Sequence, residues 1–182
     1  MLQKIGCLLV VACTPAFAAE DCYTADAAAS EVRFSVMQSG APFNGAFRRF
    51  SGEVCFTQGR LSRINAALDP ASVDSGLPEL DTVLKDKEFF AVREFPRVTF
   101  VSTTIQSQGD TATARGMLEI KGVRQETAIQ LRSQQAGGKM TVIGALTLDR
   151  LRYGIGTGEW SNTQWLGAEV KLDVKATLTH KP

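Results

Sequence analysis

Apolar and polar residues alternate with a period of two along most of the chain. The segment 168–178 is the clearest case, because Ala, Val or Leu stands at every second position and polar residues stand between them. A period of two puts successive side chains on opposite faces of a β-strand, so this pattern predicts a strand with one apolar face. Alternation or strand-forming composition predicts further strands at residues 32–36, 53–56, 64–68, 98–105, 111–120, 126–132 and 140–148.

One segment departs from this alternation, at about residues 77–90. Its leucines recur at helical spacing, at Leu77, Leu80 and Leu84. Asp74 and Ser75 precede it and are expected to accept hydrogen bonds from the free N–H groups of its first turn. A helix this short is marginal in water on its own. We therefore expect it to dock its apolar side on the strands as a lid or plug.

About eight strands, no parallel crossover unit and one helix predict an all-β fold, an eight-stranded antiparallel barrel with one inserted short α-helix. The interior of such a barrel is wide enough either to fill with side chains or to hold one small ligand. Small residues such as Ala66, Ala114 and Gly144 on the inward faces favour a cavity. A packed apolar core is the alternative that the pattern leaves open.

Residues 1–18 have a different composition, with a lysine, an apolar run up to Cys13 and a small-x-small sequence at Ala16–Ala18. This arrangement is typical of a secretory signal peptide. We expect cleavage after Ala18 and a single domain over residues 19–182. The apolar run is shorter than the roughly 20 residues of a membrane-spanning helix, and no other segment comes closer, so no transmembrane segment is expected. Lipidation of Cys13 is the alternative.

The charges balance almost completely. The chain has 20 Lys and Arg, 19 Asp and Glu and one His, and removal of residues 1–18 takes away one lysine and no acidic residue. The mature chain is then neutral. Nucleic acids and anionic membrane surfaces bind clustered positive charge. Neither is therefore expected as the main partner.

Two of the four cysteines, Cys22 and Cys55, remain after cleavage. Two cysteines in an exported chain most often form a disulfide. A disulfide would close the loop between Cys22 and Cys55 and would stabilise the fold by about 3 to 4 kcal/mol on the chain-entropy model. Two unpaired thiols are the alternative. No metal site is expected, because His180, near the end of the chain, is the only histidine.

Three alternating glycines lie between Tyr153 and Glu159, inside the segment 150–167. Phosphate-binding loops also carry repeated glycines, but they lie between a strand and a helix, and no such unit surrounds these. We interpret 150–167 as a loop that crosses the barrel mouth and is anchored by Trp160 and Trp165.

A series of short motifs runs through nearly the whole mature chain. These are Tyr23–Thr24, Ser30–Val36, Gly45–Gly52, Ser72–Gly76, Leu80–Asp81, Leu84–Lys85, Phe89–Phe90, Phe95–Ser102, Gly116–Val123 and Arg152–Gly156. In this order and spacing they resemble the YceI-like family of lipid- and polyisoprenoid-binding proteins. The resemblance implies an extended, lipocalin-like barrel in a bacterial periplasm, whose apolar interior takes a long isoprenoid or other amphiphilic chain. It implies no catalysis and no cofactor. The chain departs from the family pattern at Ala29 and Gln38, at or near which histidine is common.

We therefore expect a periplasmic protein that carries or sequesters a long-chain amphiphile: a polyisoprenoid, a quinone-like molecule or a fatty-acyl lipid. The residues expected to line the tail site are Phe34, Val36, Phe50, Leu84, Phe89, Phe90, Phe100, Leu118, Ile120, Leu146, Leu148, Val170 and Leu172. The polar residues expected to hold a head group near the mouth are Arg48, Arg49, Arg150, Arg152 and Asn162, since arginine suits bidentate contact.

An enzyme is not expected. A hydrolase needs an activated nucleophile, and the chain offers neither a suitable histidine base nor a serine on a strand-to-helix elbow. The alternative to a lipid carrier is an exported adaptor without ligand, which would bind a protein partner through the helix or the Trp160–Trp165 loop. Association into a homodimer is left open.

Overall fold

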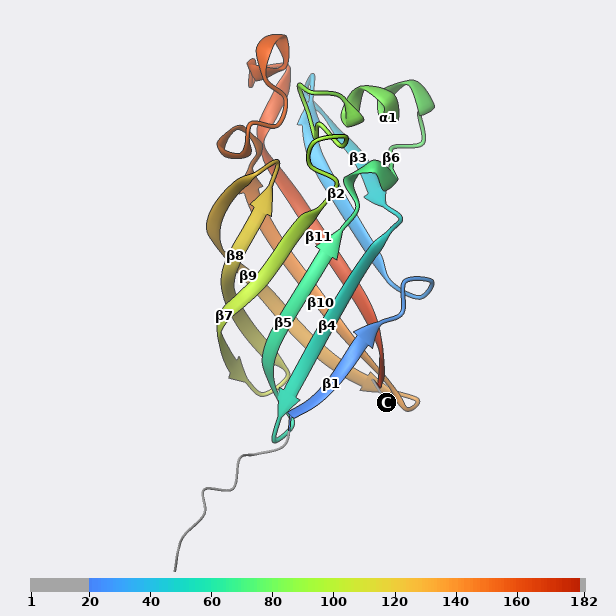
Figure 1. Cartoon of the computed structure of the whole chain (residues 1–182), viewed down its shortest axis with the longest axis vertical. Helices are drawn as coiled ribbons and strands as arrows, with labels where there is room; N and C mark the ends of the chain where they lie inside the picture. Colours follow the sequence, from blue (N-terminus) through green and yellow to red (C-terminus); the bar gives the residue numbers. More distant parts are fainter. Residues whose placement is uncertain (1–19, 181–182) are drawn as a thin grey trace, which may run out of the picture.

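The computed structural model describes residues 20–180 and has the form of a barrel, with its helix at the upper end in Figure 1. The predicted signal peptide and Cys13 lie outside the described residues. The strands are β1 (Glu20–Ala25), β2 (Glu31–Gln38), β3 (Ala41–Phe47), β4 (Phe50–Thr57), β5 (Arg60–Leu68), β6 (Val73–Asp74), β7 (Val98–Gln108), β8 (Thr111–Ile120), β9 (Val123–Ala136), β10 (Lys139–Asp149) and β11 (Leu166–His180). The described helices are α1 (Pro78–Lys85) and three 3-10 turns, η1 (Pro70–Ser72), η2 (Arg150–Tyr153) and η3 (Gly158–Ser161).

Eight strands form a closed ring in the order β1–β4–β5–β7–β8–β9–β10–β11. The ring closes where β1 pairs with β11, with Tyr23 opposite His180 and Ala25 opposite Leu178. The pairings within the ring are antiparallel. The predicted eight-stranded antiparallel barrel is therefore confirmed, and its closure removes the free strand edges that an open sheet would expose.

The other three strands extend the wall upward. β2 follows β1 and pairs with β11, β3 leads into β4 and pairs with β2, and β6 follows β5 and pairs with β3. β1 with β2, β3 with β4, and β5 with β6 therefore each run along the wall as one interrupted strand. The eleven strands thus make eight passes along the barrel. Helix α1 packs beside β6, at the edge of this upper extension.

Helix α1 is shorter than predicted. It begins at Pro78 and ends at Lys85 instead of reaching residue 90, because the backbone becomes extended at Asp86. Because the helix ends there, the chain after Asp86 turns back over the barrel interior. Phe89 and Phe90 on this segment both line the cavity described below.

The start of α1 also differs from the prediction. Its N-cap is Leu77, without a side-chain hydrogen bond. Asp74 and Ser75 therefore do not cap the helix. Ser75 instead donates from its backbone N and its hydroxyl to Oδ1 of Asp81, at 2.8 and 2.6 Å. The start of the helix is thus held by the carboxylate of Asp81 inside the helix, through a local contact with Ser75.

Candidate ligand cavity

A cavity of about 260 Å³ occupies the barrel interior. Every strand of the ring contributes to its wall, together with β2, β3, α1 and the segment after α1. The wall is almost entirely hydrocarbon. Apart from the indole of Trp160, the polar side chains on it are Gln38, Thr99 and Arg150. Between the two alternatives that the sequence left open, the structure has a cavity and not a fully packed core.

All thirteen residues expected to line a tail site do lie on the cavity wall. Their contact with a ligand stays a prediction. Other wall residues lie on the same alternating faces but are not among the thirteen predicted ones, namely Val32, Val54, Ile64, Ile129, Leu131, Val142 and Val174. The period-two pattern that identified their neighbours would have found them too. It would not have found Ile155 and Trp160, which reach the wall from outside any regular strand.

The lower end of the barrel is closed by packed side chains. Tyr23 contacts the rings of Phe56 and His180 edge-on, with centroid distances of 5.7 and 5.2 Å. Phe56, Leu61 and Leu178 are buried at this end and do not line the cavity. The cavity is therefore not open at the lower end.

The upper end is capped by the segment after α1. The ring of Phe90 lies edge-on to Phe47 of β3, and the ring of Phe89 lies edge-on to Trp160 of η3. The backbone of this segment is also tied down, since the carbonyl of Glu88 accepts hydrogen bonds from the N–H groups of Gly156 and Thr157 at 2.7 and 3.1 Å. The two phenylalanines thus bridge the gap between the β3 wall and the loop that follows β10.

Lys121, in the turn between β8 and β9, joins the same two segments. Its ammonium donates to the carbonyls of Lys87 and Gly154 at 2.6 and 2.8 Å. Burial lowers the pKa of this ammonium below its ordinary value, against the raising effect of Glu88 and Glu94. Lys121 therefore helps to fix the cap.

Arg150 organises the loop between β10 and β11. It is 2 % exposed, and all five of its N–H donors bind backbone carbonyls at 2.6 to 2.8 Å. The acceptors are the carbonyls of Gly167, Ile155, Gly156, Trp160 and Leu166. Burial lowers the pKa of this guanidinium, and Asp149 acts in the opposite direction. The prediction that Arg150 contacts a head group is not supported, because a guanidinium has five N–H groups and all are used.

The other four predicted head-group residues are exposed and do not line the cavity. Arg48 and Arg49 interrupt the path from β3 to β4 and form ion pairs with Asp74 and Asp69, at 2.8 Å each. Those ion pairs attach the short break between β3 and β4 to β6, through Asp74, and to the start of η1, through Asp69. The remaining two, Arg152 and Asn162, lie in the loop after β10. The structure thus does not assemble the predicted set around the cavity, and the wall offers Gln38 and Thr99 instead.

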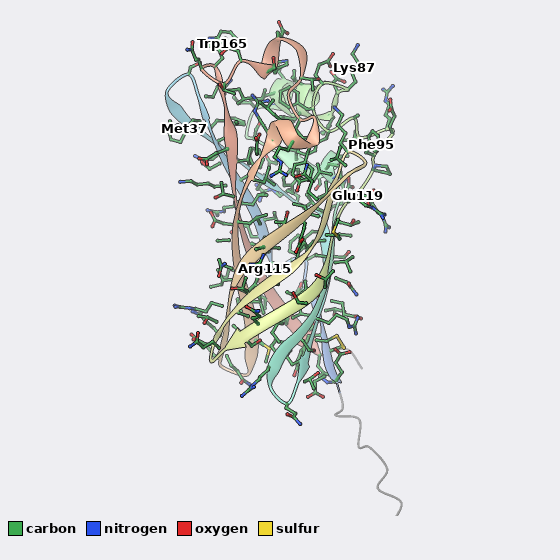
Figure 2. The ribbon with its side chains drawn as sticks, turned by 90° about the vertical axis from the view of Figure 1, so that its left-hand side faces the viewer. Met37, Lys87, Phe95, Arg115, Glu119 and Trp165 are labelled. Carbon is green, nitrogen blue, oxygen red and sulfur yellow. A yellow bond between two sulfur atoms is a disulfide. The ribbon has the colours of Figure 1, made fainter. Side chains whose placement is uncertain are left out.

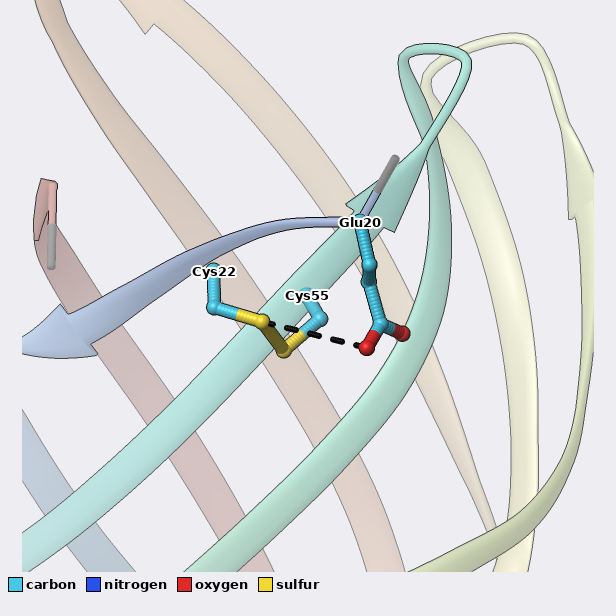
Figure 3. A group of neighbouring side chains, drawn as sticks. All are labelled: Glu20, Cys22 and Cys55. Carbon is cyan, nitrogen blue, oxygen red and sulfur yellow. Dashed lines mark hydrogen bonds between the residues drawn. A yellow bond between two sulfur atoms is a disulfide. The ribbon is translucent and has the colours of Figure 1, made fainter. Parts of the chain in front are cut away.

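Cys22 and Cys55 form a disulfide, which confirms the predicted pairing. They stand directly opposite each other in β1 and β4, with the carboxylate of Glu20 nearby (Figure 3). The two sulfurs are bonded to each other, so they do not provide thiolate ligands for a metal. Arg63 covers them, donating to Sγ of Cys55 at 3.0 Å.

Arg63 also donates to Glu20 and Glu53, at 3.0 and 2.8 Å. These hydrogen bonds raise the pKa of the Arg63 guanidinium, and the hydrogen bond from Arg63 lowers the pKa of Glu20. Through these contacts Arg63 of β5 links Glu20 of β1 to Glu53 of β4. The cluster thus holds β1, the strand that closes the ring, to its neighbours.

The fold and the cavity define a class, a closed antiparallel barrel of lipocalin-like form around an apolar interior. The sequence model of the YceI-like domain matches residues 23–178, and the chain belongs to this family. The structure is similar to the crystal structure of Burkholderia cenocepacia BcnA, with 30% identity and a TM-score of 0.81 over 85% of this chain and 99% of that one.

Two further relatives are more distant or cover less. A polyisoprenoid binding domain from Saccharophagus degradans shares the fold, with a TM-score of 0.71 and 16% identity over 87% of this chain and 98% of that one. Protein YceI of Salmonella arizonae is 30% identical over 95 residues, which are 51% of this chain and 50% of that protein. The match thus spans about half the length of the curated relative. Within residues 20–180, no helix is both long enough and apolar enough to cross a bilayer.

Proposed function

We propose that the protein binds a long-chain amphiphile in its barrel and carries or sequesters it in the periplasm, with no catalytic role. The observation that carries this proposal is the cavity of about 260 Å³ with an almost wholly apolar wall. Such a wall favours hydrocarbon, since each CH₂ group removed from water contributes about 0.8 kcal/mol. The bound chain is a polyisoprenoid, a quinone-like molecule or a fatty-acyl lipid. The description of the Saccharophagus degradans domain as polyisoprenoid-binding supports this class of ligand.

The distribution of polar groups supports one orientation of the ligand. Gln38 ends β2, Thr99 lies at the start of β7 just after the cap, and Arg150 directly follows β10, so all three belong to the upper end. The lower end offers packed apolar side chains. The tail therefore points down and the head group stays at the top, where Gln38 and Thr99 provide hydrogen-bonding groups.

The size of the cavity favours a slim ligand. Its volume of about 260 Å³ lies just below the range of about 300 to 1,000 Å³ typical of small-molecule pockets. A single unbranched or isoprenoid chain fits this space better than a bulky ring system. A tail too long for this volume requires Phe89 and Phe90 of the cap to move aside.

The periplasmic location rests on two observations. The Cys22–Cys55 disulfide is the kind of bond that persists in oxidising compartments. The composition of residues 1–18 is typical of a signal peptide.

Native mass spectrometry of the protein purified from its own host's periplasm tests the proposal. We expect a complex whose extra mass is released by organic extraction and falls in the isoprenoid or fatty-chain range. The same spectra give the mass of the mature chain and thus the cleavage site. A ligand-free mass after gentle purification, with no uptake of added polyprenol or fatty acid, would contradict the carrier and favour the adaptor.

A further inference from the structure

Among the exposed apolar side chains at the upper end of the barrel, two lie on chain segments that touch each other. Met37 in β2 is 50% exposed and Trp165, just before β11, is 63% exposed. The carbonyl of Trp165 accepts a hydrogen bond from the N–H of Ser39 at 2.8 Å, so the two chain segments touch. Figure 2 shows both side chains on the same side of the upper end. With the exposed Ala41 and Pro42, we call this group the apolar tip.

The apolar tip belongs to two segments without charged side chains. Residues 34–47 and 160–168 contain no Asp, Glu, Lys or Arg, although 21% of the chain is charged. Further along β11 the outer face carries Glu169, Lys171 and Asp173, so on this strand the uncharged stretch ends close to the upper end. Burying a charge away from water is expensive. An uncharged tip is therefore a surface that can leave water at low cost.

The tip is continuous with the cavity. Gln38 and Leu166 line the cavity, while their chain neighbours Met37 and Trp165 face solvent. The same two segments thus present one side to the bound ligand and the other to whatever the upper end meets. Because the lower end is closed, an amphiphile entering or leaving the barrel passes this rim.

We propose that the apolar tip docks the barrel on the surface of a lipid bilayer. Trp165 lies at the level of the lipid head groups, where tryptophan is favoured because its ring is apolar and its N–H is polar. Met37, close to Trp165 on the same side of the upper end (Figure 2), enters the same interfacial region. A lipid then moves between bilayer and cavity without its tail crossing bulk water. This inference rests on the proposed function, which requires a membrane as the source or destination of the ligand.

The small size of the tip determines how strongly it binds a bilayer, and its neutrality determines how binding depends on lipid charge and salt. A few side chains give weak, reversible binding, as a carrier that must leave the bilayer needs. A neutral tip binds neutral lipids without help from anionic ones, and salt does not weaken the contact, because salt screens only charges.

Co-sedimentation with neutral phosphatidylcholine vesicles tests the docking. We expect the wild-type protein to bind, with an affinity that changes little between low and high salt. Trp165→Ser and Met37→Ser each lower the partition coefficient about tenfold, which corresponds to about 1.4 kcal/mol, because each removes a large apolar side chain from the contact. Ile143→Ser is the matched control. Ile143 is also exposed, at 38%, but stands opposite Lys175 and Arg132 on the barrel wall, so its substitution should leave the partition coefficient unchanged.

Brominated lipids locate the contact directly. The two tryptophans are Trp160 and Trp165, and Trp165→Ser keeps the first. Because Trp160 lines the cavity, lipid taken up there can quench it in both proteins. The difference in fluorescence between the wild-type protein and this variant reports Trp165, and we expect brominated lipids to quench this difference signal. A difference signal that brominated lipids leave unchanged would overturn the docking geometry.

The remaining outcomes separate the docking from the proposed function. Tip variants that bind vesicles as well as the wild type would overturn the docking, even if native mass spectrometry finds a bound lipid. Concentration-dependent dimers that the tip variants abolish, without vesicle binding, would also overturn it and assign the tip to a second copy. Tip-dependent vesicle binding by a protein that takes up no lipid would preserve the docking and contradict the carrier.

Discussion

Phe90 lies edge-on to Phe47, with 5.6 Å between the ring centroids and 85° between the ring planes. The contact joins the segment after α1 to strand β3 over the upper end of the cavity. The two rings belong to segments that are distant in the chain, so their contact is a tertiary one, and it closes the upper end of the barrel. Its neighbour Phe89 makes the corresponding contact with Trp160 on the other side.

Phe90→Ala is expected to open this closure. Without the ring, the cap loses its contact with β3, and a bound amphiphile should dissociate faster, by about tenfold if the ring contributes about 1.4 kcal/mol to closure. Stopped-flow displacement of a fluorescent fatty acid measures the rate. Leu77→Ala is the control, because Leu77 is the N-cap of α1 but is exposed and does not line the cavity. An unchanged dissociation rate in Phe90→Ala would show that the cap does not gate access.

Gly52→Leu is expected to shorten the longest tail that the barrel accepts. Gly52 lines the cavity opposite Ala66, and an added Cβ would meet only Ala25 Cβ at 3.7 Å and Asn65 O at 3.8 Å, which are ordinary contacts. The position therefore has room for at least a Cβ atom, which the protein does not use. A glycine inside a strand costs roughly 0.5 to 1 kcal/mol relative to alanine, and close approach of a ligand is one reason for keeping it.

A series of fatty acids or isoprenols of rising length checks this expectation. Gly52→Ala should be as stable as the wild type or slightly more stable in urea and should bind nearly the same lengths, whereas Gly52→Leu should lose the longest. Identical length profiles for all three proteins would mean that tails do not reach β4. A large loss of stability in Gly52→Ala would mean that the glycine serves a backbone bend.

Arg150→Lys is expected to lower the free energy of unfolding by about 2 to 5 kcal/mol. Lysine has three N–H donors, so at least two of the five carbonyls lose their partner, and each buried unsatisfied group costs about 1 to 3 kcal/mol. Urea denaturation followed by circular dichroism measures the change. The exposed Arg152 gives the matched control, Arg152→Lys, for which a change within about 0.5 kcal/mol is expected. An equally small change in Arg150→Lys would refute the role of Arg150 as the anchor of this loop.

Reduction of the Cys22–Cys55 disulfide is expected to destabilise the barrel by about 3 to 4 kcal/mol. The bond fixes β1 to β4, and β1 is the strand that closes the ring against β11. Thermal unfolding with and without a phosphine reductant measures the effect. The double variant Cys22→Ser, Cys55→Ser should be destabilised to a similar degree and should not respond to the reductant. A reductant that leaves the wild-type midpoint unchanged would argue against a stabilising role.

The sequence by itself determined the all-β class, most of the strands and the faces that line the cavity, but it did not predict β1, β3 or β6. Alternation is a local property, because the pleat of each strand sends successive side chains to opposite sides whatever the partner strand is. Residues such as Phe34, Leu118 and Leu172 could therefore be placed on the inner face before any contact was known. The cysteine pair could be anticipated from the expected compartment in the same way.

Only the tertiary structure decided the features that depend on neighbours distant in the chain. The helix ends at Lys85 and not at residue 90 because its following phenylalanines find partners on β3 and η3. Arg150 became an internal anchor and not a head-group ligand because five carbonyls from the loop after β10 and the start of β11 converge on it. Trp160 faces the cavity while Trp165 faces solvent, although the sequence assigned both the same anchoring role. In each case the outcome follows from which groups meet in space, and the spacing of residues along the chain does not contain that information.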